Sequence, residues 1–279
     1  MKHLFLYLFT VLAIFKAEPV YSQDVSRFSS DKNKFSVGFE LSGSFPAGSF
    51  TNVTIKLPCN SSVNVASAFE LTLGYKINSK FGGVIVLSEG FFPMDPSSSG
   101  VSQLLNDHPG VYQSAAVFKS GQLISQAIMV GGYYNYPLSK NGKIYSKTRL
   151  MAGLIACSIP EIEVVGQRAQ GPVDINGNSI DTTESWDSPK IYAYAPSIRV
   201  DEGVYYVLNK SLEFFINLHF QVSSLTYSNV TVNSNLLVTS TNSSTGNSTT
   251  LANDNHLSVV NPTIIYQAIS LGLGCEFRF

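Results

Sequence analysis

Few residues of this 279-residue chain have the types and spacing that catalysis requires. A histidine and a serine stand two positions apart in His256-Leu257-Ser258, and nucleophilic hydrolases combine such a pair with an acid. No glutamate follows until Glu276, and the pair adjoins a tract of serine, threonine and asparagine. We therefore interpret the spacing as chance and predict no catalytic residue. His219 is interpreted as a hydrogen-bonded interior residue, and His108 as a loop residue.

The cysteines offer no metal or cofactor chemistry. Cys59, Cys157 and Cys275 are widely separated, and the chain contains no CxxC motif and no Cys/His cluster. A structural metal site is therefore not expected, and no cofactor is predicted. Cys59 and Cys157 fall on the same side of the expected fold and could pair, although we favour free thiols.

Charge and composition narrow the class of protein. Only 13% of residues are charged and the formal net charge is −1, so nothing favours a nucleic-acid partner. The charged fraction is about half of that usual in soluble domains, whereas the 18 phenylalanines and 14 tyrosines are many. Such a composition suits a protein surrounded by lipid.

The start of the chain predicts export. Lys2 precedes an apolar run from Leu4 to Phe15, which is too short to span a bilayer and is typical of a signal peptide. We expect residues 1–22 to be removed and residues 23–33 to form a short periplasmic segment. The remainder has no apolar run near 18 residues, so a membrane protein of this sequence must be a closed β-barrel.

Apolar and polar residues alternate in eight segments, which predicts eight long strands. They are 34–45, 64–77, 80–92, 122–138, 143–158, 189–200, 211–224 and 264–279. Short links and long loops alternate between them, as in an antiparallel up-and-down outer-membrane barrel with short periplasmic turns and long extracellular loops. The barrel domain is thus 34–279, and ten strands are the alternative count. A soluble lipocalin-like barrel is the competing fold. Residues 225–261 are interpreted as a long loop that contains a mobile low-complexity tract, 239–250.

If the apolar stripes face lipid, the opposite stripes face the barrel interior. An eight-stranded barrel has room only for side chains, so buried charges must pair there. The predicted interior polar network consists of Glu40, Glu70, Lys147, Arg149, Arg199, Glu213, His219, Glu276 and Arg278. A plug of ion pairs is the favoured interpretation, and a narrow ion or proton path is the alternative.

Aromatic residues near the strand ends are expected to form interfacial girdles. These residues are Phe91, Tyr133, Tyr134, Tyr136, Tyr192 and Tyr194. A carbohydrate-stacking surface is the rival interpretation.

By layout, the chain after the signal peptide resembles the small outer-membrane β-barrel proteins of the OmpA- and OmpX-like eight-stranded type, and Ser22-Gln23 resembles the signal-peptide end of Bacteroidetes-type members. The sharpest motif of the resemblance is the closing segment. The match lies in Tyr266, Leu271, Leu273, Phe277 and Phe279. In that family this pattern is a signal for the barrel-assembly machinery. The resemblance implies an integral protein of the Gram-negative outer membrane, in contact with lipid and lipopolysaccharide.

The sequence accordingly predicts a non-enzymatic surface protein, in which a plugged barrel anchors loops that contact an unknown extracellular or membrane partner. A porin-like narrow pore, or an accessory subunit of a transport or secretion complex, is the alternative. A lipid-modifying enzyme is a weaker one.

Overall fold

The computed structural model describes residues 34–47, 52–53, 61–63, 65–95, 112–119, 121–168, 178–242 and 245–279. The expected signal peptide, the segment 23–33, Cys59 and His108 lie outside these residues. Within them, no helix has the length and hydropathy needed to cross a membrane.

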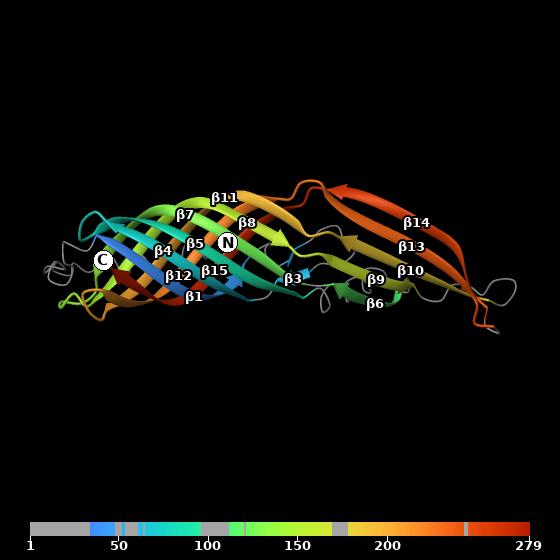
Figure 1. Ribbon diagram of the computed structural model, residues 1–279, viewed down its shortest axis with the longest axis horizontal. Helices are drawn as coiled ribbons and strands as arrows, with labels where there is room; N and C mark the ends of the chain where they lie inside the picture. The colour runs from blue at the N-terminus through green and yellow to red at the C-terminus, as the bar shows by residue number, and fades with distance from the viewer. Residues whose placement is uncertain are drawn as a thin grey trace.

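Eight antiparallel strands close into a barrel, which confirms the predicted fold class and decides between eight strands and ten (Figure 1). They are β1 (Phe35–Pro46), β4 (Ala66–Lys76), β5 (Phe81–Asp95), β7 (Gln122–Pro137), β8 (Ile144–Ile159), β11 (Ile191–Val207), β12 (Leu212–Thr226) and β15 (Thr263–Arg278). The order is β5-β4-β1-β15-β12-β11-β8-β7, and pairing of β5 with β7 closes the ring.

The register fixes the width and tilt of the barrel. Cross-strand partners lead from Phe91 through Ser67, Gly43, Leu271, Leu218, Glu202, Thr148 and Tyr134 back to β5 at Phe81. One circuit therefore returns ten residues away on the same strand. For eight strands this stagger corresponds to a tilt of about 40° and an interior that side chains fill.

Three tight turns and the C-terminal residue lie at one end of the barrel, here named the turn end. Asn78 accepts hydrogen bonds from the backbone N–H groups of Lys80 and Phe81. In the expected Asn-Gly hairpin, Gly142 has φ of 68°, a conformation that glycine adopts without strain. The third turn follows Val207, so the prediction that this strand ends at residue 200 was wrong. Asp201 belongs to β11, where it pairs with Arg149 of β8 and His219 of β12, and its side chain is buried inside the barrel.

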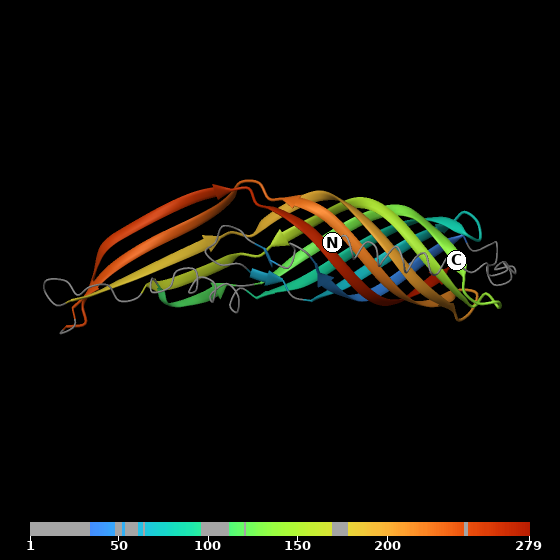
Figure 2. The ribbon, with the colours of Figure 1, turned by 180° about the vertical axis from the view of Figure 1, so that it is seen from behind.

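The long connections at the other end, here named the sheet end, were expected to be loops, but most of their described residues form strands. β6 (Tyr112–Lys119), β9 (Ile162–Arg168), β10 (Ser179–Ser188), β13 (Val230–Thr241) and β14 (Ser248–Val260) make a second sheet of order β14-β13-β10-β9-β6. This surface sheet extends beyond the barrel along its long axis (Figures 1 and 2). β2 (Asn52–Val53) and β3 (Ser61–Val63) pair near the end of β5.

The low-complexity tract is part of the surface sheet rather than a loop. Thr239, Ser240 and Thr241 of β13 pair with Thr250, Thr249 and Ser248 of β14. Antiparallel pairing uses backbone groups, so a strand whose neighbour is supplied does not need apolar side chains.

Prolines mark the boundary between barrel and surface sheet. Pro160 separates β8 from β9, Pro189 separates β10 from β11, and Pro262 separates β14 from β15. Proline has no N–H to donate to a ladder, so each interrupts pairing at the same level of the molecule. The barrel and the surface sheet are consequently two sheets rather than one.

Candidate functional site

The centre of the barrel holds a layer of ion pairs built around Asp201. The Nε of Arg199 lies 2.7 Å from Asp201 Oδ1, and the Nε of Arg149 lies 3.0 Å from Asp201 Oδ2. Arg199 also places Nη2 2.7 Å from Glu70 Oε2. All four side chains are almost completely buried.

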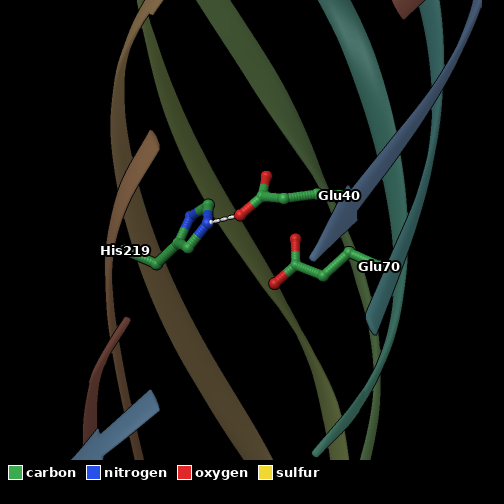
Figure 3. Close-up of side chains that lie close together, drawn as sticks. All are labelled: Glu40, Glu70 and His219. Carbon is green, nitrogen blue, oxygen red and sulfur yellow. Dashed lines mark hydrogen bonds and ion pairs between the residues drawn. The ribbon is translucent and has the colours of Figure 1, made fainter. Parts of the chain in front are cut away.

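His219 of β12 and Glu40 of β1 complete this central layer (Figure 3), and only β15 lies between their two strands. His219 Nε2 contacts Glu40 Oε1, and Asn217 donates to Glu40 Oε2 over 2.8 Å. His219 Nδ1 lies 3.0 Å from Asp201 Oδ1 and 2.8 Å from Arg199 Nη2.

Charge counting identifies the protonation state that suits this layer. Glu40, Glu70 and Asp201 carry three negative charges, whereas Arg149 and Arg199 carry two positive ones. An unbalanced charge inside a barrel is costly, so neutrality favours an imidazolium that donates to Glu40 and Asp201. In a neutral imidazole, Nδ1 would instead accept a hydrogen bond from Arg199 Nη2, 2.8 Å away, but the layer would then keep one uncompensated negative charge.

The register explains why the arginines are needed. Glu40 and Glu70 are direct cross-strand partners on β1 and β4, and Glu213 and Glu276 are partners on β12 and β15. Like charges directly opposite one another destabilise a sheet. The cations of β8, β11 and β15 compensate both pairs from across the bore or along the wall.

Glu40, Glu70 and His219 could each offer one ligand atom to a metal ion, since these atoms lie within 4.8 Å of one another. The donor set does not favour an ion, because Arg199 already occupies Glu70, while Asn217 and His219 occupy Glu40. The negative charges of this layer are instead balanced by its own arginine and histidine side chains.

A second charged layer fills the turn end. Lys147 Nζ lies 2.7 Å from Glu276 Oε2, and Arg278 Nη2 lies 2.7 Å from both oxygens of Glu213. The Tyr145 hydroxyl donates to Glu213 over 2.5 Å and accepts from Arg278 over 2.9 Å. Tyr205 stacks on Tyr145, with ring centroids 5.1 Å apart, and Lys147 Nζ lies 4.3 Å from the Tyr205 centroid.

An apolar layer closes the sheet end of the bore. Phe92, Leu123, Ile155, Ile159, Leu225 and Tyr266 of the barrel pack with Trp186, Val230 and Val232 of the surface sheet. Between this layer and the central ion pairs is a cavity of about 20 Å³, lined by Glu70, Arg199, His219 and several serines. That volume suits about one water molecule. Among the described residues, side chains thus occupy the bore at three levels: two charged layers and one apolar layer.

The structure places all nine predicted interior residues inside the barrel and links them in two layers. Arg278 is the most exposed, at 18% of its side chain. Sequence reasoning missed Asp201, Asn217, Tyr145 and Tyr205. Asp201 is two residues from Arg199 and therefore faces the same side of β11, but it lies beyond residue 200, where the predicted strand ends.

Other predicted residues divide between the two faces. Leu271, Leu273, Phe277 and Phe279 of the closing segment point outward, whereas Tyr266 is buried inside and packs edge-on against Phe92. Among the expected girdle residues, Tyr192 and Tyr194 are exposed. Tyr133 instead packs inside the barrel, with its ring 5.0 Å from Lys147 Nζ.

The candidate catalytic and redox residues show no assembled site. His256 is exposed on β14, and its imidazole has no carboxylate partner among the described residues. Nothing is described of the Ser258 side chain. Cys157 and Cys275 are free thiols, and Cys157 is buried in the apolar layer.

No family model and no curated protein matches the sequence. Among solved structures, Neisserial surface protein A is similar, with 10% identity over 88% of this chain and 97% of its own, and a TM-score of 0.45. AlkL, an outer membrane protein studied in DMPC bilayers, has 13% identity, coverages of 94% and 96%, and a TM-score of 0.43. Ail of Yersinia pestis has 9% identity, coverages of 88% and 97%, and a TM-score of 0.36. The barrel assignment rests on its own closed strand pairing rather than on these likenesses.

Proposed function

We propose that this chain is an integral outer-membrane protein whose plugged barrel anchors a surface sheet for contact with a partner. The observation that carries the proposal is the contrast between the two sides of the barrel wall. Charges and an apolar layer fill the inside, whereas large apolar side chains cover the outside. A protein with this distribution of side chains is stable in a lipid bilayer and conducts no ions.

The outer wall has the height of a bilayer core. Exposed apolar side chains occur on every barrel strand, for example Leu41, Phe69, Ile85, Ile128, Leu154, Ile198, Ile216 and Leu273. Phe91 and Phe81 face outward at the two ends of the register circuit, ten residues apart. At a tilt of about 40° they are separated by about 25 Å along the barrel axis, the height of an outer-membrane apolar band.

The polar groups of this outer wall are bonded to one another. Glu202 accepts hydrogen bonds from Ser146 and Thr148 of the neighbouring strand, and Gln126 donates to Glu89 over 2.8 Å. Such pairing lowers the cost of a polar side chain that faces lipid. Glu202 is five residues from the end of β11, and Glu89 is six residues from the end of β5, so both lie within the wall.

The orientation and route of the protein belong to the same proposal. Residues 1–22 direct export, the turn end and residues 23–33 lie in the periplasm, and the surface sheet projects outside among lipopolysaccharide. The outward residues Leu271, Leu273, Phe277 and Phe279 are the signal read by the barrel-assembly machinery. The interior layers have a structural role, and the protein is not an enzyme.

Planar-bilayer recordings test the central point. The purified mature protein, first shown to be folded by heat-modifiable migration on gels, should give no steady conductance because both charged layers and the apolar layer close the bore. Steady channels would overturn the plug and favour the pore alternative. Recovery of the native protein in a soluble periplasmic fraction would overturn the membrane location.

A further inference from the structure

β14 is an open edge of the surface sheet. It pairs with β13 on one side, and no described strand pairs with its other side. Leu251, Leu257 and Val259 are 57%, 66% and 58% exposed. An edge strand presents alternate N–H and C=O groups that are free to pair with another strand.

The edge has little protection against such pairing. Proteins usually block an edge strand with lysine, proline, a bulge or a very short length. β14 has 13 residues, and from Ala252 to Val260 it contains no lysine, arginine or proline. Its register irregularity lies beyond this stretch, opposite the Val238/Thr239 step of β13.

The side chains of this edge are complementary to themselves. In an antiparallel pair of two copies centred on Asn255, Asp254 of each copy stands opposite His256 of the other. Both residues lie on the same face of the sheet, because Asp254 pairs with Leu236 and His256 with Ser234, two residues apart on β13. A two-fold pair therefore makes two equivalent acid–imidazole contacts.

The direction of β14 decides where the second copy must be. In each molecule β14 runs from the outer tip of the surface sheet towards the barrel (Figure 1). Two copies in one membrane would direct their β14 strands the same way, whereas the self-complementary pair is antiparallel. The two barrels must then point in opposite directions, which places them in two facing membranes.

The lengths allow this arrangement. Asn255 is seven residues from Ser248 at the tip and eight residues from Thr263, where the barrel strand begins. These segments span about 23 Å and about 26 Å. The first residue of β14 thus stops short of Thr263 in the other molecule, whereas the hairpin turn 242–247 extends beyond Ser248.

We propose that β14 binds β14 of a second copy in an opposing membrane, joining two surface sheets into one and holding two membranes together. This inference rests on the proposed function, because it requires the barrel in a bilayer with the surface sheet outside. The binding site is the β14 edge from Ala252 to Ser258, centred on Asn255.

Vesicle clustering tests the proposal. The mature protein is reconstituted into lipid vesicles in two fluorescently labelled populations, and clustering is followed by light scattering and by energy transfer between the labels. Clustering is expected only when both populations carry the protein. D254K places a cation opposite His256, and H256E places a second carboxylate opposite Asp254, so each variant alone should cluster about tenfold more weakly.

Mixing the two variants is the decisive measurement. A D254K copy facing an H256E copy regains both contacts, lysine against glutamate and histidine against aspartate. Mixed vesicles should therefore cluster although neither population does so alone. K210E, a charge change in the exposed turn at the other end of the barrel, should cluster like the unmodified protein.

The failures of the two proposals are distinguishable. If the protein is heat-modifiable and its surface sheet is accessible to protease, but vesicles stay separate, β14 self-pairing is wrong and the membrane anchor stands. Clustering that D254K and H256E leave unchanged, or that mixing does not restore, would likewise overturn the β14 site. Protein that does not insert at all contradicts the membrane proposal instead.

Discussion

At the scale of single residues, the central layer of the barrel depends on one proton. Three carboxylates face two guanidiniums, and His219 lies between Glu40 and Asp201. Its imidazole is the group whose charge completes the balance. Removing His219 and removing Glu40 should therefore change the stability of the barrel by unequal amounts, although the two side chains contact each other.

We expect H219Q to lower the free energy of unfolding by about 3–5 kcal/mol, because it leaves one buried negative charge without a partner. E40Q should have a small effect, since His219 can then lose its proton, and Glu70 and Asp201 balance Arg149 and Arg199. The double variant E40Q/H219Q should recover most of the loss. Urea unfolding in lipid vesicles, followed by gel mobility, measures all three. A double variant no more stable than H219Q would contradict the charge count.

At the scale of elements, β7 and β8 approach so closely that glycine is required between them. A Cβ on Gly153 would lie 1.9 Å from the carbonyl oxygen of Ile128, and one on Gly131 would lie 2.0 Å from that of Leu150. Backbone atoms of a barrel wall cannot move away without changing the register. Inside the wall, Met129 and Met151 fill the adjacent space.

G153A is expected to destabilise the barrel by about 3 kcal/mol through this clash. G43A is the matched control, because the nearest atom to its added Cβ is 4.0 Å away, on Phe45. The control should change stability by less than about 0.5 kcal/mol. Both are compared by the urea midpoint of the folded form in vesicles. Equal midpoints for the two alanine variants would show that the close approach is absent.

At the scale of the whole molecule, the described residues of the barrel and of the surface sheet pack together in the apolar layer. β12 and β15 pair directly up to Thr226 and Thr263, so the barrel ladder is complete below the hairpin that they carry. The surface sheet contributes Trp186, Val230 and Val232 to the layer that closes the bore. The charged layers lie nearer the turn end and do not involve the surface sheet.

A variant in which a tight Asn-Gly turn replaces residues 227–262 should therefore still fold into a heat-modifiable barrel. Loss of Tyr227, Val230 and Val232 from the apolar layer should lower its stability by about 5 kcal/mol. It should remain non-conducting, because both charged layers are intact, and it should not cluster vesicles. Conductance after this deletion would show that the apolar layer alone closes the bore.

The sequence by itself determined which side chains face inward, because strand periodicity assigns a face to each residue before any partner is known. Eight strands, their direction and the inward charges from Glu40 to Arg278 followed from that alternation. It could not reveal that Glu40 opposes Glu70, or that Asp201 joins Arg149 to Arg199, since those contacts depend on register between strands far apart in the chain. Nor could it show that polar connections such as Thr239–Thr250 become strands. Backbone hydrogen bonding between strands leaves no mark on amino-acid composition. A tract of serine, threonine and asparagine can therefore extend a sheet only where the tertiary structure supplies neighbouring strands.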